Sequence, residues 1–139
     1  MSILKKTLLV IAILVLPCLA FADDATTFPN LVGEWEGRAQ YHSGLHGHVT
    51  PEPGITTPLV ITSQEGPVIA GFVSWNDKHE GRDDFSGVFD MDGETFYLAG
   101  HNAGVRICKM DGPDKFIYYF MIPGTDNPAA GYAIYTRVK

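Results

Sequence analysis

Three histidines in one short segment are the residues whose type and spacing best suit metal chemistry. His42, His46 and His48 lie in the stretch YHSGLHGHVTPEPG. Imidazole nitrogen is a common ligand of zinc and copper, and three imidazoles on one loop can converge on a single ion. The spacing H-x3-H-x-H matches no strong metal signature, and the glycines make the segment flexible. We therefore keep two interpretations, a metal site and a solvated polar loop, and assign no cofactor.

The sequence supports nucleophilic or acid–base catalysis less than it supports metal binding. The serines lack the strand–turn–helix elbow that exposes a catalytic hydroxyl, and the histidines lie in predicted loops. The neighbouring carboxylates of Asp83 and Asp84 would point to opposite sides of any strand, which is wrong for joint acid–base work. The sequence therefore argues against an enzyme.

The elements that position these residues are predicted to be short β-strands. Apolar segments alternate with turn signals such as MDGE, HNAG and DGPD, and Asp-Gly turns between β-rich runs are strong hairpin signals. No helical period of useful length occurs after residue 22. The pattern predicts eight strands: Gly33–His42, Pro58–Gln64, Val68–Trp75, Asp84–Asp90, Glu94–Ala99, Gly104–Met110, Lys115–Ile122 and Ala130–Val138.

Eight strands joined by hairpin-like turns either stack as a sandwich or close as a barrel. Closure removes both sheet edges, which otherwise invite aggregation. We favour an all-β fold, an eight-stranded antiparallel up-and-down β-barrel. The interior of such a barrel is either just filled by side chains or holds one small ligand.

The first predicted strand shows the alternation of a sheet with one face in the core. Charged and amide side chains occupy one face, and the other face carries Gly33, Trp35, Gly37, Ala39 and Tyr41. Trp35 is therefore expected to point inward and to plug one end of the barrel, with the glycines leaving room for its ring.

The two ends of this domain carry Gly33-Glu34-Trp35 on the first strand and Arg137 in the closing segment IYTRVK. With these residues the chain resembles the calycin superfamily of lipocalins, avidins and related barrels. In such barrels the last strand closes against the first and the arginine packs over the tryptophan, a contact that contributes about 0.5–2 kcal/mol. The segment FSGVFDMDG is also similar to a group of small, uncharacterised exported bacterial proteins.

Among calycins, the length and the closing strand look more like avidins, but the avidin activity does not carry over. Gly37 stands where avidins place an asparagine, and Tyr41 where they place a biotin-contacting serine. Ala133 replaces a polar ligand residue of the last strand. The chain has only two tryptophans, Trp35 and Trp75, so the walls of a biotin pocket are missing.

The amino terminus has the pattern of a signal peptide. Lys5 and Lys6 precede the apolar run Thr7–Leu16, which is too short to span a bilayer, and Ala20-Phe21-Ala22 is a small-x-small cleavage site. We expect cleavage of residues 1–22, a single domain over residues 23–139, and a periplasmic or secreted protein that leaves the membrane.

Charge and cysteine content narrow the partners further. The chain carries 10 basic and 16 acidic residues, for a net charge of −6, and its acidic residues are dispersed. This surface argues against nucleic acid and anionic membranes as partners. Cleavage would leave Cys108 as the one cysteine, in the apolar stretch VRICKM. We expect a buried thiol there, with a disulfide between two copies as the alternative.

Three functions remain open. The first is a carrier that binds a small apolar or aromatic molecule in a cavity; the second is an inhibitor or interaction protein using the segment DDATTFPN or HVTPEPG; the third is a metal-binding protein. The aromatic residues expected to line the cavity are Tyr41, Trp75, Phe85, Phe89, Tyr97, Tyr118 and Phe120.

The last two predicted strands carry apolar side chains on both faces. With Arg137 pointing inward, the outer face presents a stripe of Tyr119, Met121, Tyr132 and Ile134. Exposed apolar stripes usually mark an interface. We therefore predict a homodimer through these two strands, unless another segment of the chain covers them.

Overall fold

The computed structural model describes residues 26–76, 80–102, 104–124 and 126–139. The predicted signal peptide, residues 1–22, lies outside these residues. Within them no helix is long and apolar enough to cross a membrane. The described chain forms antiparallel strands: β1 Gly33–Ser43, β2 Gly47–Val49, β3 Thr57–Glu65, β4 Val68–Asn76, β5 Glu80–Phe89, β6 Thr95–Gly100, β7 Val105–Met110, β8 Lys115–Ile122 and β9 Ala129–Arg137.

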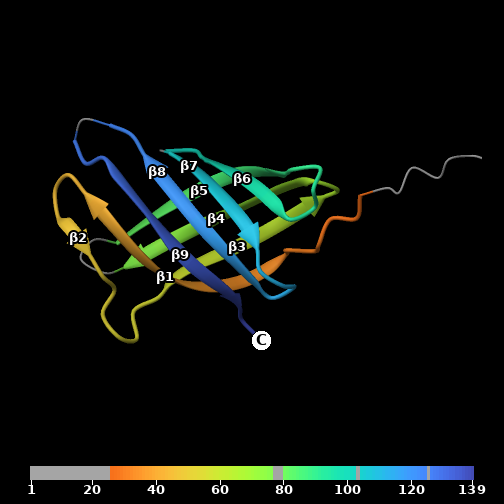
Figure 1. Ribbon diagram of the computed structural model, residues 1–139, viewed down its shortest axis with the longest axis horizontal. Coiled ribbons are helices and arrows are strands. Elements are labelled where there is room, and N and C mark those ends of the chain that lie inside the picture. The colour runs from red at the N-terminus through yellow and green to blue at the C-terminus, as the bar shows by residue number, and fades with distance from the viewer. Residues whose placement is uncertain (1–25, 77–79, 103, 125) are drawn as a thin grey trace, which may run out of the picture.

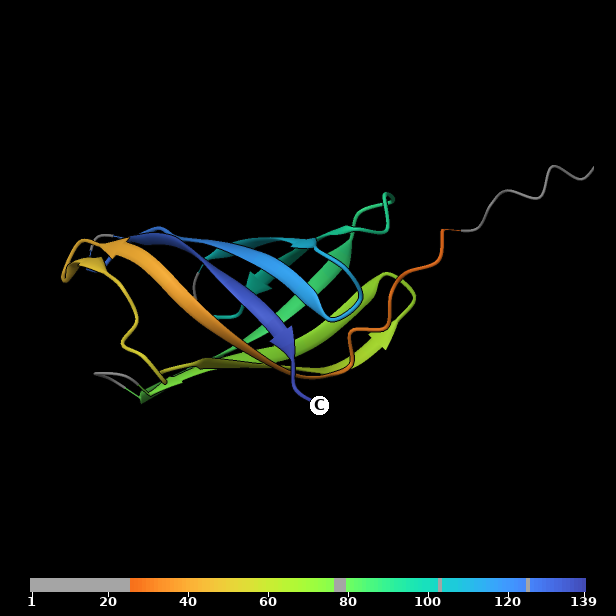
Figure 2. The same cartoon turned by 60° about the horizontal axis from the view of Figure 1, so that its bottom comes forward.

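The strands close into a barrel (Figures 1 and 2). Strand β1 pairs with β3, each following strand pairs with the next, and β9 pairs back onto β1 from Trp35↔Arg137 to Ser43↔Ala129. The predicted eight-stranded antiparallel up-and-down β-barrel is thereby confirmed, and the sandwich is excluded. The short β2 is an addition that folds back on the end of β1.

The structure corrects two connections that the sequence pattern left as loops. The segment between the first two predicted strands contains β2, whose His48 pairs with His42 in register. Strand β5 begins at Glu80 rather than at Asp84. This earlier start has a physical cause, because Arg82 stacks on the Phe72 ring, 3.6 Å from its centroid, and Asp83 is buried. Both contacts require strand geometry that the charge-rich sequence conceals.

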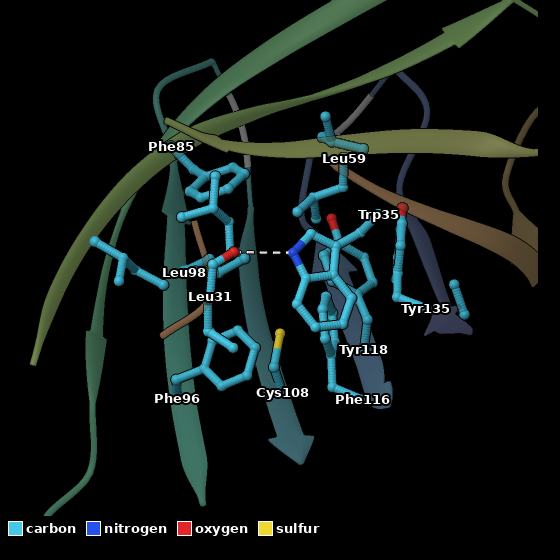
Figure 3. Packing of buried hydrophobic residues seen from close by; sticks show 14 of the residues in the cluster. Leu31, Trp35, Leu59, Phe85, Phe96, Leu98, Cys108, Phe116, Tyr118 and Tyr135 are labelled. Carbon is cyan, nitrogen blue, oxygen red and sulfur yellow. Dashed lines mark hydrogen bonds between the residues drawn. The ribbon is translucent and has the colours of Figure 1, made fainter. Parts of the chain in front are cut away.

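One end of the barrel is solid. Inward-facing side chains of all the barrel strands meet there, and the segment before β1 covers them, with Leu31 buried and Phe28 packed on the cluster. Gln64 holds this segment by accepting from Leu31 N over 2.8 Å and donating to Pro29 O over 2.9 Å. Figure 3 shows the buried residues Leu31, Trp35, Leu59, Phe85, Phe96, Leu98, Cys108, Phe116, Tyr118 and Tyr135.

Trp35 and Arg137 seal this end, as the calycin resemblance implies. The guanidinium lies over the indole, with its central carbon 4.3 Å from the ring centroid. The indole Nε1 donates to Leu31 O over 3.0 Å (Figure 3). Arg137 donates to Asn30 O over 2.7 Å and to Val32 O over 3.1 Å, so that one side chain ties the amino-terminal segment to the last strand.

Gly37, two residues after Trp35, leaves space for a neighbouring aromatic ring. A Cβ at Gly37 would lie 2.7 Å from the ring of Tyr135, which therefore occupies the space that a side chain would take. Tyr135 stacks on Phe116 at a centroid distance of 5.1 Å, and Phe116 packs on Trp35 at 4.8 Å. The small residue beside the large one thus admits a second aromatic ring to the seam between β1 and β9.

The seal leads to a stability prediction. We expect Arg137→Met to lower the free energy of unfolding by about 2–3 kcal/mol, because it removes a cation–π contact and charge-assisted hydrogen bonds to two backbone carbonyls. Urea denaturation measures the change. Asp114→Ala is the matched control: Asp114 accepts from Arg137 Nε over 2.9 Å but is half exposed, so its loss should cost about 0–1 kcal/mol. Equal losses in the two variants would contradict a structural role for the carbonyl and indole contacts.

Candidate ligand cavity

The other half of the barrel is hollow. A cavity of about 750 Å³ lies on the side of the β1–β3, β4–β5, β6–β7 and β8–β9 connections, away from the amino-terminal segment. Aromatic and small residues form part of its wall: Tyr41 and Phe120 lie 6.0 Å apart between ring centroids, as do Tyr118 and Phe120. Ala39 and Ala133, a register pair of β1 and β9, both line it. The barrel is therefore neither filled throughout nor open throughout.

Of the seven aromatic residues expected around the cavity, some line it and others lie elsewhere in the structure. Tyr41, Trp75, Tyr118 and Phe120 line it. Phe85 and Phe89 face inward but lie in the solid end, where Phe89 packs on Phe96 and on Phe28.

Tyr97 is placed differently, on the outer surface. It is 38% exposed and its hydroxyl donates to Asp90 Oδ2 over 3.1 Å. Phe96 and Leu98 take the inner face of β6. The expectation that Tyr97 faces the interior is therefore corrected. Side chains alternate along β6, and the inward positions are those of Phe96 and Leu98 rather than that of Tyr97.

A buried polar group, Asp83, Arg106 and Tyr118, forms part of the cavity wall. Arg106 Nη2 donates to Asp83 Oδ2 over 2.5 Å, and Arg106 Nε donates to Tyr118 Oη over 3.0 Å. Asp83 Oδ1 accepts from Asn102 N over 2.9 Å, just beyond the end of β6. Both members of the ion pair are about 4% exposed. An ion pair this deeply buried is stable only because its members satisfy each other.

Burial and the contacts within this group together determine its protonation. It lowers the pKa of Arg106, but the contacts with Tyr118 and Asp83 outweigh it, so the net pKa is raised and the guanidinium stays charged. Burial raises the pKa of Tyr118 to about 12, against the opposing effect of Arg106. Tyr118 is therefore a neutral hydroxyl at physiological pH. Desolvation also raises the pKa values of Tyr135 and Cys108 well above their usual range.

Asp83 and Arg106 were not among the candidate site residues. For Asp83 no signal was available, since it stands in a charged run. For Arg106 a signal existed: Cys108 was expected to be buried, and a residue two positions away on a strand shares its face. The buried, free Cys108 fits the expected structural thiol, and its position leaves no surface for a disulfide between two copies.

The histidines lie at the rim of the barrel. His42 and His48 are in contact, with ring centroids 4.8 Å apart in an edge-to-face arrangement. His46 is exposed, and its backbone N–H donates to Ser43 Oγ over 3.0 Å. Across the described ranges, no three or more His, Cys, Asp and Glu side chains are grouped so that they could hold a metal ion. Metal binding therefore stays a prediction without an assembled site in these residues.

No protein-family model matches the sequence, and no curated protein matches it. Among solved structures the chain is similar to the possum milk whey lipocalin trichosurin, crystallised with bound 4-ethylphenol. The identity is 12% over 81% of this chain and 76% of that chain, with a TM-score of 0.45. A likeness this distant carries no argument about a ligand. The strands themselves form a closed antiparallel β-barrel with an internal cavity, joined between β1 and β9 and sealed by Trp35 and Arg137.

Proposed function

We propose that the protein binds a small apolar or aromatic molecule inside its barrel and acts as a carrier. The observation that supports this proposal is the cavity, because ligand pockets typically measure about 300–1,000 Å³ and are lined mainly by apolar and aromatic groups. At about 750 Å³, with four aromatic residues of the predicted set in its wall, this cavity falls within that range.

The small residues of the wall strengthen the proposal. Side chains fill the interior of many eight-stranded barrels, and they do so in the solid end of this one. In the hollow half, Ala39 and Ala133 lie side by side on neighbouring strands, where larger residues would fill part of the space. Larger side chains at these positions would add packing contacts, so the small residues keep open a space that a purely structural barrel does not need.

The neutral dye N-phenyl-1-naphthylamine tests the proposal, because its fluorescence rises in an apolar site. We expect saturable binding with one site per barrel and expect Ala39→Leu, which fills part of the cavity, to weaken it about threefold to tenfold. Ala99→Leu is the matched control, because Ala99 is an exposed alanine on the outer face of β6.

Two outcomes would contradict the carrier. The dye could fail to bind, or Ala39→Leu and Ala99→Leu could weaken it equally, which would place the site outside the barrel. Urea denaturation of both variants separates a filled cavity from a damaged fold.

Export and self-association belong to the same proposal. The predicted cleavage after Ala22 would deliver the carrier to the periplasm or the exterior. The predicted homodimer would use the outer face of β8 and β9, where Tyr119, Met121, Tyr132 and Ile134 are 41–48% exposed. That exposure supports an interface but identifies no partner, so the dimer stays a prediction. No feature described above favours the inhibitor alternative.

A further inference from the structure

We propose that the cavity selects an uncharged ligand that carries a hydrogen-bond-accepting oxygen, which accepts from Arg106 or Tyr118. This inference rests on the proposed carrier function and specifies the chemical class of its ligand. An aromatic ketone is the simplest molecule of this class. Three features of the polar group support the inference: an unused donor on Arg106, the direction of the Tyr118 hydroxyl, and the charge balance with Asp83.

The first feature is the Arg106 guanidinium. Its Nε and Nη2 are used by Tyr118 and Asp83. Its Nη1 is the one buried side-chain nitrogen or oxygen without a hydrogen-bond partner in the described part of the chain. Native proteins satisfy almost every such group, and an orphaned donor calls for an explanation. Arg106 also lines the cavity, and we infer that an acceptor reaches Nη1 from the cavity.

Nη1 is enclosed, so the contact requires a side-chain shift in the cavity wall. Changes of side-chain rotamer at a binding site are common when a partner binds. The shift is compensated by a charge-assisted hydrogen bond in a site with little water, where such bonds are strongest.

The second feature is the Tyr118 hydroxyl. Its oxygen accepts from Arg106 Nε, so its own hydrogen must point elsewhere. Among the described residues no acceptor for that hydrogen is found. Tyr118 lines the cavity with Arg106, so the cavity wall holds a second donor besides the guanidinium. A carbonyl oxygen can accept from either of these groups.

The third feature is charge. Arg106 and Asp83 already neutralise each other across a contact in which both side chains are about 4% exposed. A carboxylate ligand would add an uncompensated negative charge beside the buried Asp83, which is unfavourable where water is scarce. A neutral carbonyl leaves the balance unchanged. The site therefore discriminates by charge as well as by hydrogen bonding.

Three probes of nearly equal shape test this inference: acetophenone, α-methylstyrene and benzoate. The first two differ only in C=O against C=CH2, and benzoate adds a negative charge. Displacement of N-phenyl-1-naphthylamine at neutral pH gives their relative affinities. We expect acetophenone to bind about tenfold to 100-fold more tightly than α-methylstyrene, and more tightly than benzoate.

Tyr118→Phe should reduce the preference for acetophenone over α-methylstyrene several-fold. Tyr132→Phe is the matched control, since Tyr132 lies on the outer face with its hydroxyl bonded to Gln40, and it should leave the preference unchanged. Tyr118→Phe also removes an acceptor from Arg106, so circular dichroism must verify its fold; if it unfolds, the three probes on the unaltered protein decide.

The failures are distinguishable. If neither the dye nor any probe binds, the carrier proposal fails and this inference fails with it. If the dye binds but acetophenone and α-methylstyrene compete equally, or benzoate competes best, the carrier stands and the selection for an uncharged oxygen is overturned.

Discussion

Trp35→Ala should lower the free energy of unfolding by about 3–5 kcal/mol, the usual loss when a large aromatic side chain is removed from a core. The indole is fully buried, contacts Phe116 and lies under Arg137. Its removal opens a void where the first and last strands meet. It also deletes the hydrogen bond to Leu31 O, so the amino-terminal cover loses an anchor. Equilibrium denaturation in urea measures the change.

Trp75→Ala supplies the comparison, because it removes the same side chain from the other end of the barrel. Trp75 lines the cavity and is 37% exposed, so its loss should cost about 1 kcal/mol or less. It should instead change the binding of the dye. If the two tryptophans proved equally important for stability, the solid end would not be the structural centre of the fold.

The second large effect concerns the buried ion pair. We expect Asp83→Ala to destabilise the protein by about 3–5 kcal/mol, because it leaves the Arg106 charge buried without its partner. Thermal or urea denaturation measures the loss. The double variant Asp83→Ala with Arg106→Met should lose less than Asp83→Ala alone, since both charges are then absent.

The adjacent residue offers an internal control. Asp84 also pairs with an arginine, Arg82, over 2.7 Å, but both side chains are more than half exposed. Exposed pairs contribute about 0–1 kcal/mol, so Asp84→Ala should have little effect. A large loss in Asp84→Ala, or a small one in Asp83→Ala, would mean that burial does not determine the contribution of these carboxylates.

The fold could be predicted because its information is local and repeated. The alternation around Trp35 fixed the inner face of β1, and turns such as MDGE marked where strands end. The pairing of Trp35 with Arg137 joined the two ends of the domain. Each feature depends on residues close in sequence or on one recognisable pair. Strand β2 was missed because three residues are too few to show a period.

The cavity could be predicted only in part because its position depends on the combined volume of side chains from every strand. Phe85 and Trp75 are both inward-facing aromatic residues, yet one belongs to the solid end and the other to the cavity wall. Nothing in the amino-acid sequence around either residue indicates this difference. The partnership of Asp83 with Arg106 is equally invisible, since it joins residues 23 positions apart.

The contrast between the two ends of the barrel has an evolutionary consequence. Most of the buried apolar side chains gather under Trp35 and Arg137, whereas the cavity lies toward the opposite end of the same strands and includes the buried pair Asp83–Arg106 in its wall. Mutations at exposed rim positions can thus accumulate without destabilising the barrel, whereas Asp83 and Arg106 are constrained by their buried ion pair. We expect variants of this chain to acquire new ligand preferences while keeping the β1–β9 pairing and the Trp35–Arg137 contact unchanged.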